Sequence, residues 1–133
     1  MAFVWPVRVY WEDTDAGGVV YYANYLKFME RARSEWLRAF GFEQDVLRDE
    51  AGVVFVVRRV EIDYLSPARF NEQLEVSVRL HEMGRVSLNV KQELMRGSDC
   101  LARTEVTLAC VDAVRFKPVK IPEPLIQALA QAT

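Results

Sequence analysis

The residues best suited to chemistry lie in one stretch, Glu12–Tyr25, which combines three carboxylates, two adjacent glycines and three tyrosines. The stretch precedes an amphipathic helical pattern, and the first turn of a helix has unpaired N–H groups and a partial positive charge. These groups could stabilise negative charge on a carbonyl oxygen while a carboxylate attacks the carbonyl or activates a water. The glycines would let the backbone approach a ligand closely. A turn shaped by the same residues, without any chemistry, explains them equally well on physical grounds.

Other site chemistries lack the residues they require. The only histidine, His81, occupies a polar position of an alternating strand, where a solvated side chain is expected. One histidine and two distant cysteines do not form a zinc-ligand pattern, and no fuller calcium loop accompanies Glu12, Asp13 and Asp15. The chain has no Gly-x-Ser-x-Gly nucleophile elbow and no glycine-rich phosphate loop. The prediction is therefore carboxylate chemistry without a metal.

Length and composition predict one α+β domain over residues 1–133, because an apolar fraction of 51% can fill a single core. Seventeen basic and nineteen acidic residues give a net charge of −2, which argues against a nucleic-acid partner. No apolar run reaches the roughly 18 residues of a membrane span. Cys100 and Cys110 would lie about 33 Å apart on one strand, too far for a disulfide. Free thiols and an N-terminus without a secretory leader predict the cytoplasm.

The first elements expected are a strand over Val7–Trp11, with Pro6 as its first residue, and a long helix over residues 23–40. Asn24 could cap this helix, and Gly41 is a natural stop. Six residues form its apolar face: Tyr25, Phe28, Met29, Ala32, Trp36 and Phe40.

Everything after the helix is expected to be sheet until a short terminal helix over Leu125–Ala132. The apolar run Val53–Val57 is typical of a strand buried on both faces, and alternation continues to Tyr64. Three further alternating runs are separated by turns: Leu74–His81, Val86–Lys91 and Ala102–Cys110. The expected fold is a curved five-stranded antiparallel sheet with the long helix across one face.

Glu12–Tyr25 resembles the signature of hotdog-fold acyl-CoA thioesterases of the 4-hydroxybenzoyl-CoA thioesterase family. The resemblance extends through three later segments, Met29–Arg33, Phe55–Arg59 and Tyr64–Arg69, which are most similar to the Tol-Pal-associated YbgC branch. It implies a helix wrapped by a curved antiparallel sheet, dimers with continuous sheets or dimers of dimers, and active sites at subunit interfaces. Leu26 and Leu37, on the otherwise polar side of the helix, could mark such a contact.

The resemblance implies a role for each residue of the motif that matches. Asp15 would be the catalytic carboxylate, acting as nucleophile or general base toward a thioester carbonyl. The backbone N–H of Tyr22 would hold the thioester oxygen, and Gly18 would give the substrate close access. Glu12 and Asp13 are expected to be structural. The YbgC branch usually has histidine at the position of Tyr22, so the chain resembles one branch overall and the 4-hydroxybenzoyl-CoA branch here.

The resemblance also implies that coenzyme A, as part of the substrate, binds basic residues at the subunit surface, and two segments match these positions. Arg85 and Ser87 follow the turn at Gly84, and Arg115 and Lys117 lie in the segment Arg-Phe-Lys-Pro. The basic residues among them could pair with nucleotide phosphates. Ordinary solvated side chains at strand ends are an equally good interpretation.

The leading prediction is an acyl-CoA thioesterase that hydrolyses an acyl or aroyl thioester to free acid and coenzyme A, without a metal or redox cofactor. The alternative is a non-catalytic module that binds acyl-CoA or acyl carrier protein and is linked to cell-envelope machinery. A hotdog dehydratase is weaker, because such enzymes pair an acid with a histidine and His81 lies far from Asp15 in the sequence.

Overall fold

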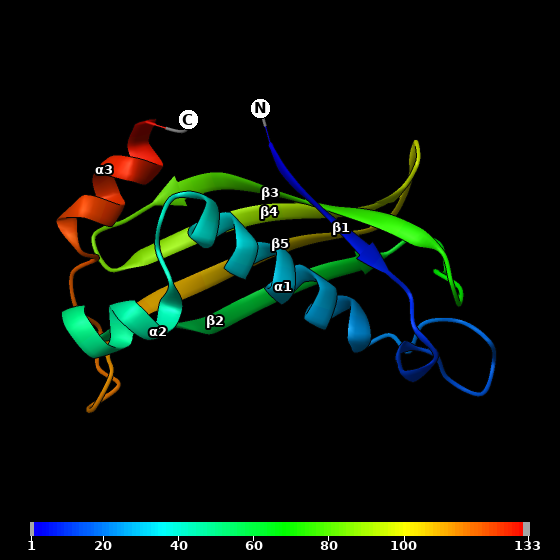
Figure 1. Cartoon of the computed structure of the whole chain (residues 1–133), viewed down its shortest axis with the longest axis horizontal. Coiled ribbons are helices and arrows are strands. Elements are labelled where there is room, and N and C mark those ends of the chain that lie inside the picture. The colour runs from blue at the N-terminus through cyan, green and yellow to red at the C-terminus, as the bar shows by residue number, and fades with distance from the viewer. Residues whose placement is uncertain (1, 132–133) are drawn as a thin grey trace.

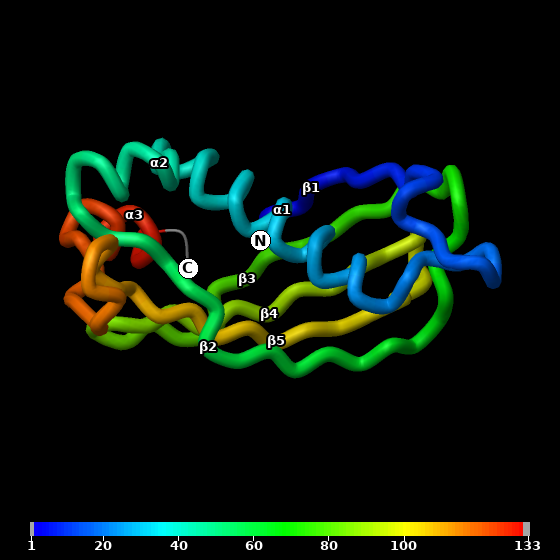
Figure 2. Tube along the Cα trace, turned by 90° about the horizontal axis from the view of Figure 1, so that it is seen from below, coloured from blue at the N-terminus to red at the C-terminus, as the bar shows by residue number. Residues whose placement is uncertain are grey.

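The computed structural model describes residues 2–131 and has two layers, a curved antiparallel sheet and the helix α1 across one face (Figures 1 and 2). The strand order is β1-β3-β4-β5-β2, so that β1 and β2 are the two edges. The strands are β1 (Phe3–Arg8), β2 (Val53–Tyr64), β3 (Gln73–Met83), β4 (Ser87–Arg96) and β5 (Asp99–Asp112). This is the predicted α+β hotdog architecture.

The helix α1 (Asn24–Ala39) forms as its 3.6-residue apolar period predicts, and it ends at Gly41. Gly41 has φ +89, its amide donates to the Arg38 carbonyl at 2.9 Å, and the Phe42 amide donates to the Leu37 carbonyl at 3.1 Å. Five of the six predicted apolar-face residues are buried, and the sixth is partly buried against the core: Tyr25, Phe28, Met29, Ala32, Trp36 and Phe40. The helix is therefore held mainly by its packing on the sheet.

The buried surface of α1 is wider than the predicted stripe. Leu37 is only 4% exposed and packs in the core, so the expectation that it marks a subunit contact is wrong, while Leu26 is exposed. Arg33 is buried as well, and its guanidinium donates to the Gln92 side chain at 3.0 Å. Burial lowers the pKa of Arg33. The side-chain amide nitrogen of Gln92 donates in turn to the Met29 carbonyl at 2.9 Å. The sheet curves around the helix enough to cover more than one stripe.

The strand β2 is an edge strand, and the prediction that Val53–Val57 is buried on both faces is wrong for a single chain. Val53 is buried, but Val57 is 48% exposed. Within residues 2–131, β2 pairs only with β5, with a register irregularity between Val57 and Arg59. This twelve-residue strand, which is apolar in its first five residues, therefore presents a long unpaired edge of a kind that proteins rarely leave open.

The opposite edge, β1, begins and ends earlier than predicted. It runs over Phe3–Arg8 with Pro6 in its interior, paired in register with Glu75. Proline is tolerated there because an edge strand needs ladder bonds on one side only. Trp11, predicted as strand, instead starts a short 3-10 helix, η1 (Trp11–Asp13), and is 73% exposed. Trp11 fits the alternating pattern of the sequence, but β1 ends three residues earlier, at Arg8.

Beyond α1 the chain forms a short helix α2 (Gln44–Val46) and a π-helical turn η2 (Leu47–Ala51), neither of which was predicted. The terminal helix α3 (Glu123–Gln131) confirms the prediction of a helix there, although its expected last residue, Ala132, lies outside the described residues. Leu125 and Leu129 of α3 are fully buried. No helix within residues 2–131 is long and apolar enough to cross a membrane.

Candidate active site

Asp15 lies in a small hairpin over residues 14–20, which leads from η1 toward α1 and projects at one end of the sheet (Figure 1). The Asp15 amide donates to the Val19 carbonyl at 2.9 Å. The Gly18 amide closes the turn on the Asp15 carbonyl at 3.2 Å, with Gly18 at φ +81, a conformation that favours glycine. Val19 also bridges to Arg69 in the β2–β3 loop. The hairpin is thus anchored on both sides.

The Asp15 carboxylate is exposed, and only one of its two oxygens accepts a hydrogen bond. Its Oδ1 accepts the Gly17 amide at 2.8 Å. Its Oδ2 has no hydrogen-bond partner within residues 2–131. A Cβ added at Gly17 would lie 3.2 Å from Oδ1, so a side chain there would crowd the carboxylate. One oxygen is therefore oriented by the backbone, and the other is free to meet a reacting atom.

Asp13 is a structural residue, as predicted, and differs sharply from Asp15. It is 3% exposed, and it accepts the Tyr10 amide and the Asn24 side-chain amide, each at 2.8 Å. The expectation that Asn24 caps α1 is wrong, because the capping position is Ala23 and the Asn24 side chain turns back to Asp13. This bond ties the first turn of α1 to the loop that carries Asp15. Glu12 is exposed.

The amides of Tyr22 and Ala23, just before α1, donate no hydrogen bond to any described residue. The amides of residues 24, 25 and 26 do have partners, because they donate to the carbonyls of residues 21, 22 and 23 at 2.8, 3.4 and 3.2 Å. A trans peptide directs its N–H and C=O in opposite directions, and no peptide bond here is cis. Because the Tyr21 carbonyl points into the first turn of α1, the Tyr22 N–H points out of the helix start.

The rings of Tyr22, Tyr25 and Tyr64 form an aromatic cluster beside this amide. Tyr64 is not among the site residues that the sequence predicts. Tyr64 ends β2, and its hydroxyl donates to the Tyr22 carbonyl at 2.9 Å. In the sequence Tyr64 alternates with Val60 and Ile62, which puts the three side chains on one face of the strand but does not point to the start of α1. A shallow depression here is lined by Val20, Tyr22, Tyr25, Tyr64, Leu65, Ser66 and Pro67.

The predicted coenzyme A residues lie at the other end of the sheet from Asp15 (Figures 1 and 2). Arg85 lies in the β3–β4 turn and Ser87 is the first residue of β4, while Arg115 and Lys117 lie in the loop between β5 and α3. The Asp112 carboxylate accepts the Arg115 and Val114 amides at 2.8 and 2.9 Å and so shapes that loop.

The two ends are separated by the length of β3, whose eleven residues span about 35 Å. The amide of Ile121 donates to the Arg85 carbonyl, which joins the two basic segments at the same end. The structure therefore brings Asp15 and Tyr22 to one end, and the four coenzyme A candidates to the other.

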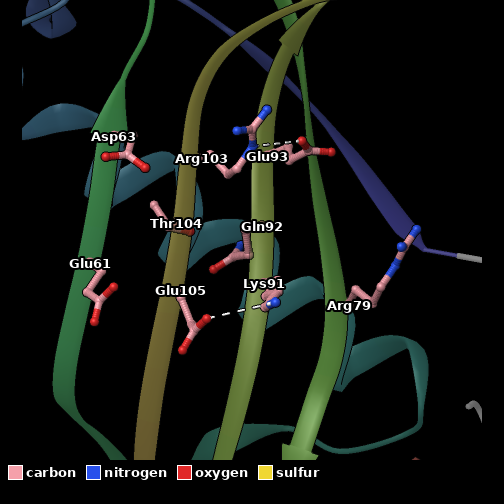
Figure 3. A pocket seen from close by; sticks show the side chains of 9 residues that line it. All are labelled: Glu61, Asp63, Arg79, Lys91, Gln92, Glu93, Arg103, Thr104 and Glu105. Atoms are coloured by element: carbon pink, nitrogen blue, oxygen red, sulfur yellow. Dashed lines mark hydrogen bonds and ion pairs between the residues drawn. The ribbon is translucent and has the colours of Figure 1, made fainter.

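A separate groove on the sheet face away from α1 is lined by charged side chains (Figure 3). Arg103 pairs with Glu93 at 3.3 Å, and Lys91 pairs with Glu105 at 4.0 Å. Exposed cross-strand pairs of this kind are ordinary surface features. Among residues 2–131 no group of three or more His, Cys, Asp or Glu is placed to hold a metal. Cys100 and Cys110 are free thiols on β5, as predicted, and His81 is exposed beside Glu82.

Comparison with known proteins identifies the family. Residues 9–129 match the thioesterase-like superfamily. The acyl-CoA thioesterase YbgC of Haemophilus influenzae is 46% identical over 121 residues, covering 91% of this chain and 89% of its own. The acyl-CoA thioester hydrolase YbgC of Escherichia coli O6:H1 is 43% identical over 97% of this chain and 96% of its own. A probable thioesterase from Bartonella henselae has a matching crystal structure, with a TM-score of 0.87, 34% identity, and coverage of 92% of this chain and 100% of that one.

The family match extends over the hairpin, α1 and the strands β2 to β5, and begins just after β1, which ends at Arg8. The match to the Escherichia coli relative covers 97% of the chain. These matches confirm the fold and the resemblance inferred from Glu12–Tyr25 and the three later segments. The chain belongs to the thioesterase-like superfamily, and its enzyme class is thioester hydrolase.

Proposed function

We propose that the protein is an acyl-CoA thioesterase in which Asp15 acts on the thioester carbonyl and the Tyr22 N–H holds the carbonyl oxygen. The observation that supports this most directly is the unpartnered Tyr22 amide, which points out of the start of α1. It lies on the segment that follows Asp15, whose carboxylate has one oxygen without a hydrogen bond to any described residue. Relatives named acyl-CoA thioesterases support the substrate class. The free cysteines favour the cytoplasm as its location.

The reaction begins with the thioester oxygen on the Tyr22 amide, where the helix start favours developing negative charge. Asp15 then attacks the carbonyl carbon, the C–S bond breaks with its electron pair on sulfur, and water hydrolyses the resulting anhydride. In the alternative route Asp15 takes a proton from a water that attacks the same carbon. Neither route uses the Tyr22 side chain, a metal or a redox cofactor.

The complete site is proposed to form between two copies of the chain. Asp15 and the basic residues Arg85, Arg115 and Lys117 lie about 35 Å apart in one chain, at opposite ends of the sheet. Antiparallel pairing of β2 with β2 of a second copy would close the open edge and bring opposite ends of the two chains together. The basic residues of one copy would then bind the coenzyme A phosphates of a substrate whose thioester lies on the Tyr22 of the other.

The test is release of thiol from a panel of short-chain, long-chain and aromatic acyl-CoAs by the wild type and by Asp15→Asn. The variant is expected to lose about 10²–10⁴-fold in kcat, because it removes the attacking or proton-accepting group. Glu12→Gln is the matched control, since it neutralises an exposed carboxylate three residues away in the same loop. Thermal unfolding of both variants separates chemistry from loop stability.

Near-normal turnover by a folded Asp15→Asn variant would overturn the role of Asp15. Tight binding of acyl-CoA by the wild type, with no thiol released from any member of the panel, would instead support the non-catalytic binding module. Binding and turnover of an acyl carrier protein thioester in the same assay would extend the substrate class to that carrier.

A further inference from the structure

Tyr64 connects the edge strand β2 to the start of α1 through one hydrogen bond. It is the last residue of β2, and 42 positions separate it in sequence from Tyr22, whose carbonyl accepts its hydroxyl at 2.9 Å. Burial raises the pKa of Tyr64, as do the neighbouring tyrosines 22 and 25 to a smaller extent. The hydroxyl therefore stays protonated and able to donate throughout the neutral pH range.

The Tyr64 ring is held from two sides, so that its hydroxyl has a defined direction. It makes an edge contact with Tyr25, with ring centroids 5.2 Å apart and planes at 72°, and another with Tyr22 at 6.2 Å and 88°. Tyr25 is itself fixed, because its hydroxyl accepts the Ala68 amide at 2.9 Å and its side chain is buried. Although Tyr64 is 44% exposed, its ring thus packs on one side against a buried, hydrogen-bonded tyrosine.

The hydrogen bond from the Tyr64 hydroxyl acts on the peptide between Tyr22 and Ala23. The other donor to this carbonyl, the Tyr25 amide, lies at 3.4 Å, which is long for an N–H···O bond. Tyr64 supplies the shorter contact and so contributes most to holding this peptide in place. The peptide carries the outward Ala23 N–H, and its orientation also constrains Tyr22, whose own N–H points out of the helix start.

We propose that Tyr64 is a positioning residue for the thioesterase reaction, whose hydroxyl holds the Tyr22–Ala23 peptide so that the outward amides stay aimed at the thioester oxygen. The proposal rests on the proposed function. It follows from the way an oxyanion donor works, because such a donor stabilises the transition state only if it is already oriented when charge develops. Small displacements of such a group cost large factors in rate.

A purely structural role for the hydroxyl predicts a different result. In that case Tyr64 would only fasten β2 to α1, and its loss would lower the free energy of unfolding without changing the folded enzyme's kcat. Tyr64→Phe separates the two roles, because it keeps both ring contacts and removes only the oxygen.

The experiment measures kcat and KM for the best acyl-CoA substrate, thermal unfolding, and the amide nitrogen and proton shifts of Ala23. For Tyr64→Phe, kcat is expected to fall about three- to tenfold, as expected for one lost hydrogen bond, with KM unchanged. The Ala23 amide signal should move, since its peptide loses a hydrogen-bond donor. The control is Tyr21→Phe, which removes a hydroxyl that interacts with the Tyr22 side chain rather than with its carbonyl, and its kcat should stay at the wild-type value.

A wild-type kcat in Tyr64→Phe, or an equal loss in Tyr21→Phe, would overturn the proposal, and so would a loss confined to stability. If the wild type releases no thiol from any acyl-CoA, the proposed function fails and the positioning role fails with it. A normal wild type combined with an unaffected Tyr64→Phe variant contradicts the positioning role alone.

Discussion

Pairing two damaged copies of the chain should restore activity if each active site is shared between them. One copy carries Asp15→Asn and the other carries Arg115→Ala with Lys117→Ala. All three positions are exposed in the single chain, so neither set of changes removes core packing. In a mixed dimer, one site combines both defects, while the other combines the intact Asp15 of one copy with the intact basic loop of its partner.

The expected size of the effect follows from this count of sites. Each homodimer should be poorly active: the Asp15→Asn dimer lacks the reacting group, and the other loses two charge-assisted phosphate contacts of about 1.5–3 kcal/mol each. The loss of the two phosphate contacts corresponds to a decrease of about 10²–10⁴-fold in kcat/KM at low substrate concentration. The mixed dimer keeps one intact site of two and should show about half of the wild-type activity per dimer.

The assay is coexpression of the two copies with different affinity tags, purification over both columns, and thiol release at a substrate concentration well below KM. Each homodimer, purified in parallel, sets the baseline, and thermal unfolding confirms that all three species are folded. A mixed dimer no more active than its parents would refute the shared site, since that is the result when Asp15 and the basic loop of the same chain serve one site.

Two further predictions concern stability. Asp13→Ala should lower the free energy of unfolding by about 3 kcal/mol, because it removes two hydrogen bonds to a buried charge and leaves the Asn24 side chain unpaired. Urea unfolding measures this free energy, and a decrease below about 1 kcal/mol would contradict the structural role of Asp13. Burial raises the pKa of Cys110 from 9.0 to about 11, so the unfolded thiol ionises first and stability should fall as pH rises from 9 to 11. Cys110→Ala should remove that part of the pH dependence, and parallel curves for the two proteins would be the contrary result.

The fold was largely predictable because its signals are local and periodic. The stripe on α1, the stop at Gly41 and the alternating strands are each set by neighbours a few residues apart, and all appear in the structure. Predictions failed where a residue's surroundings depend on distant segments. Leu37 lies on the polar side of a helical projection, yet in the folded chain it is 4% exposed and belongs to the core. Val53–Val57 looked doubly buried, yet the strand order places it at an edge.

The candidate site was predictable in part for the same reason. Asp15 and Tyr22 belong to one continuous motif, so their proximity along the chain is visible in the sequence. Tyr64 became visible only when the fold brought the end of β2 to the start of α1. Asp13 and Asp15 are alike in type and two residues apart, and only three-dimensional burial separates the structural carboxylate from the exposed one.

The two sheet edges have opposite consequences for how far assembly can proceed. The β1 edge carries Pro6, which has no N–H to offer an incoming strand, and the strand is six residues long. The β2 edge is twice that length and holds no proline. Strand pairing between copies is therefore favoured at one edge and discouraged at the other. In the proposed dimer, growth along the sheet would stop after two chains. The pair would expose only its proline-bearing edges, which would protect an apolar β-rich protein from open-ended aggregation.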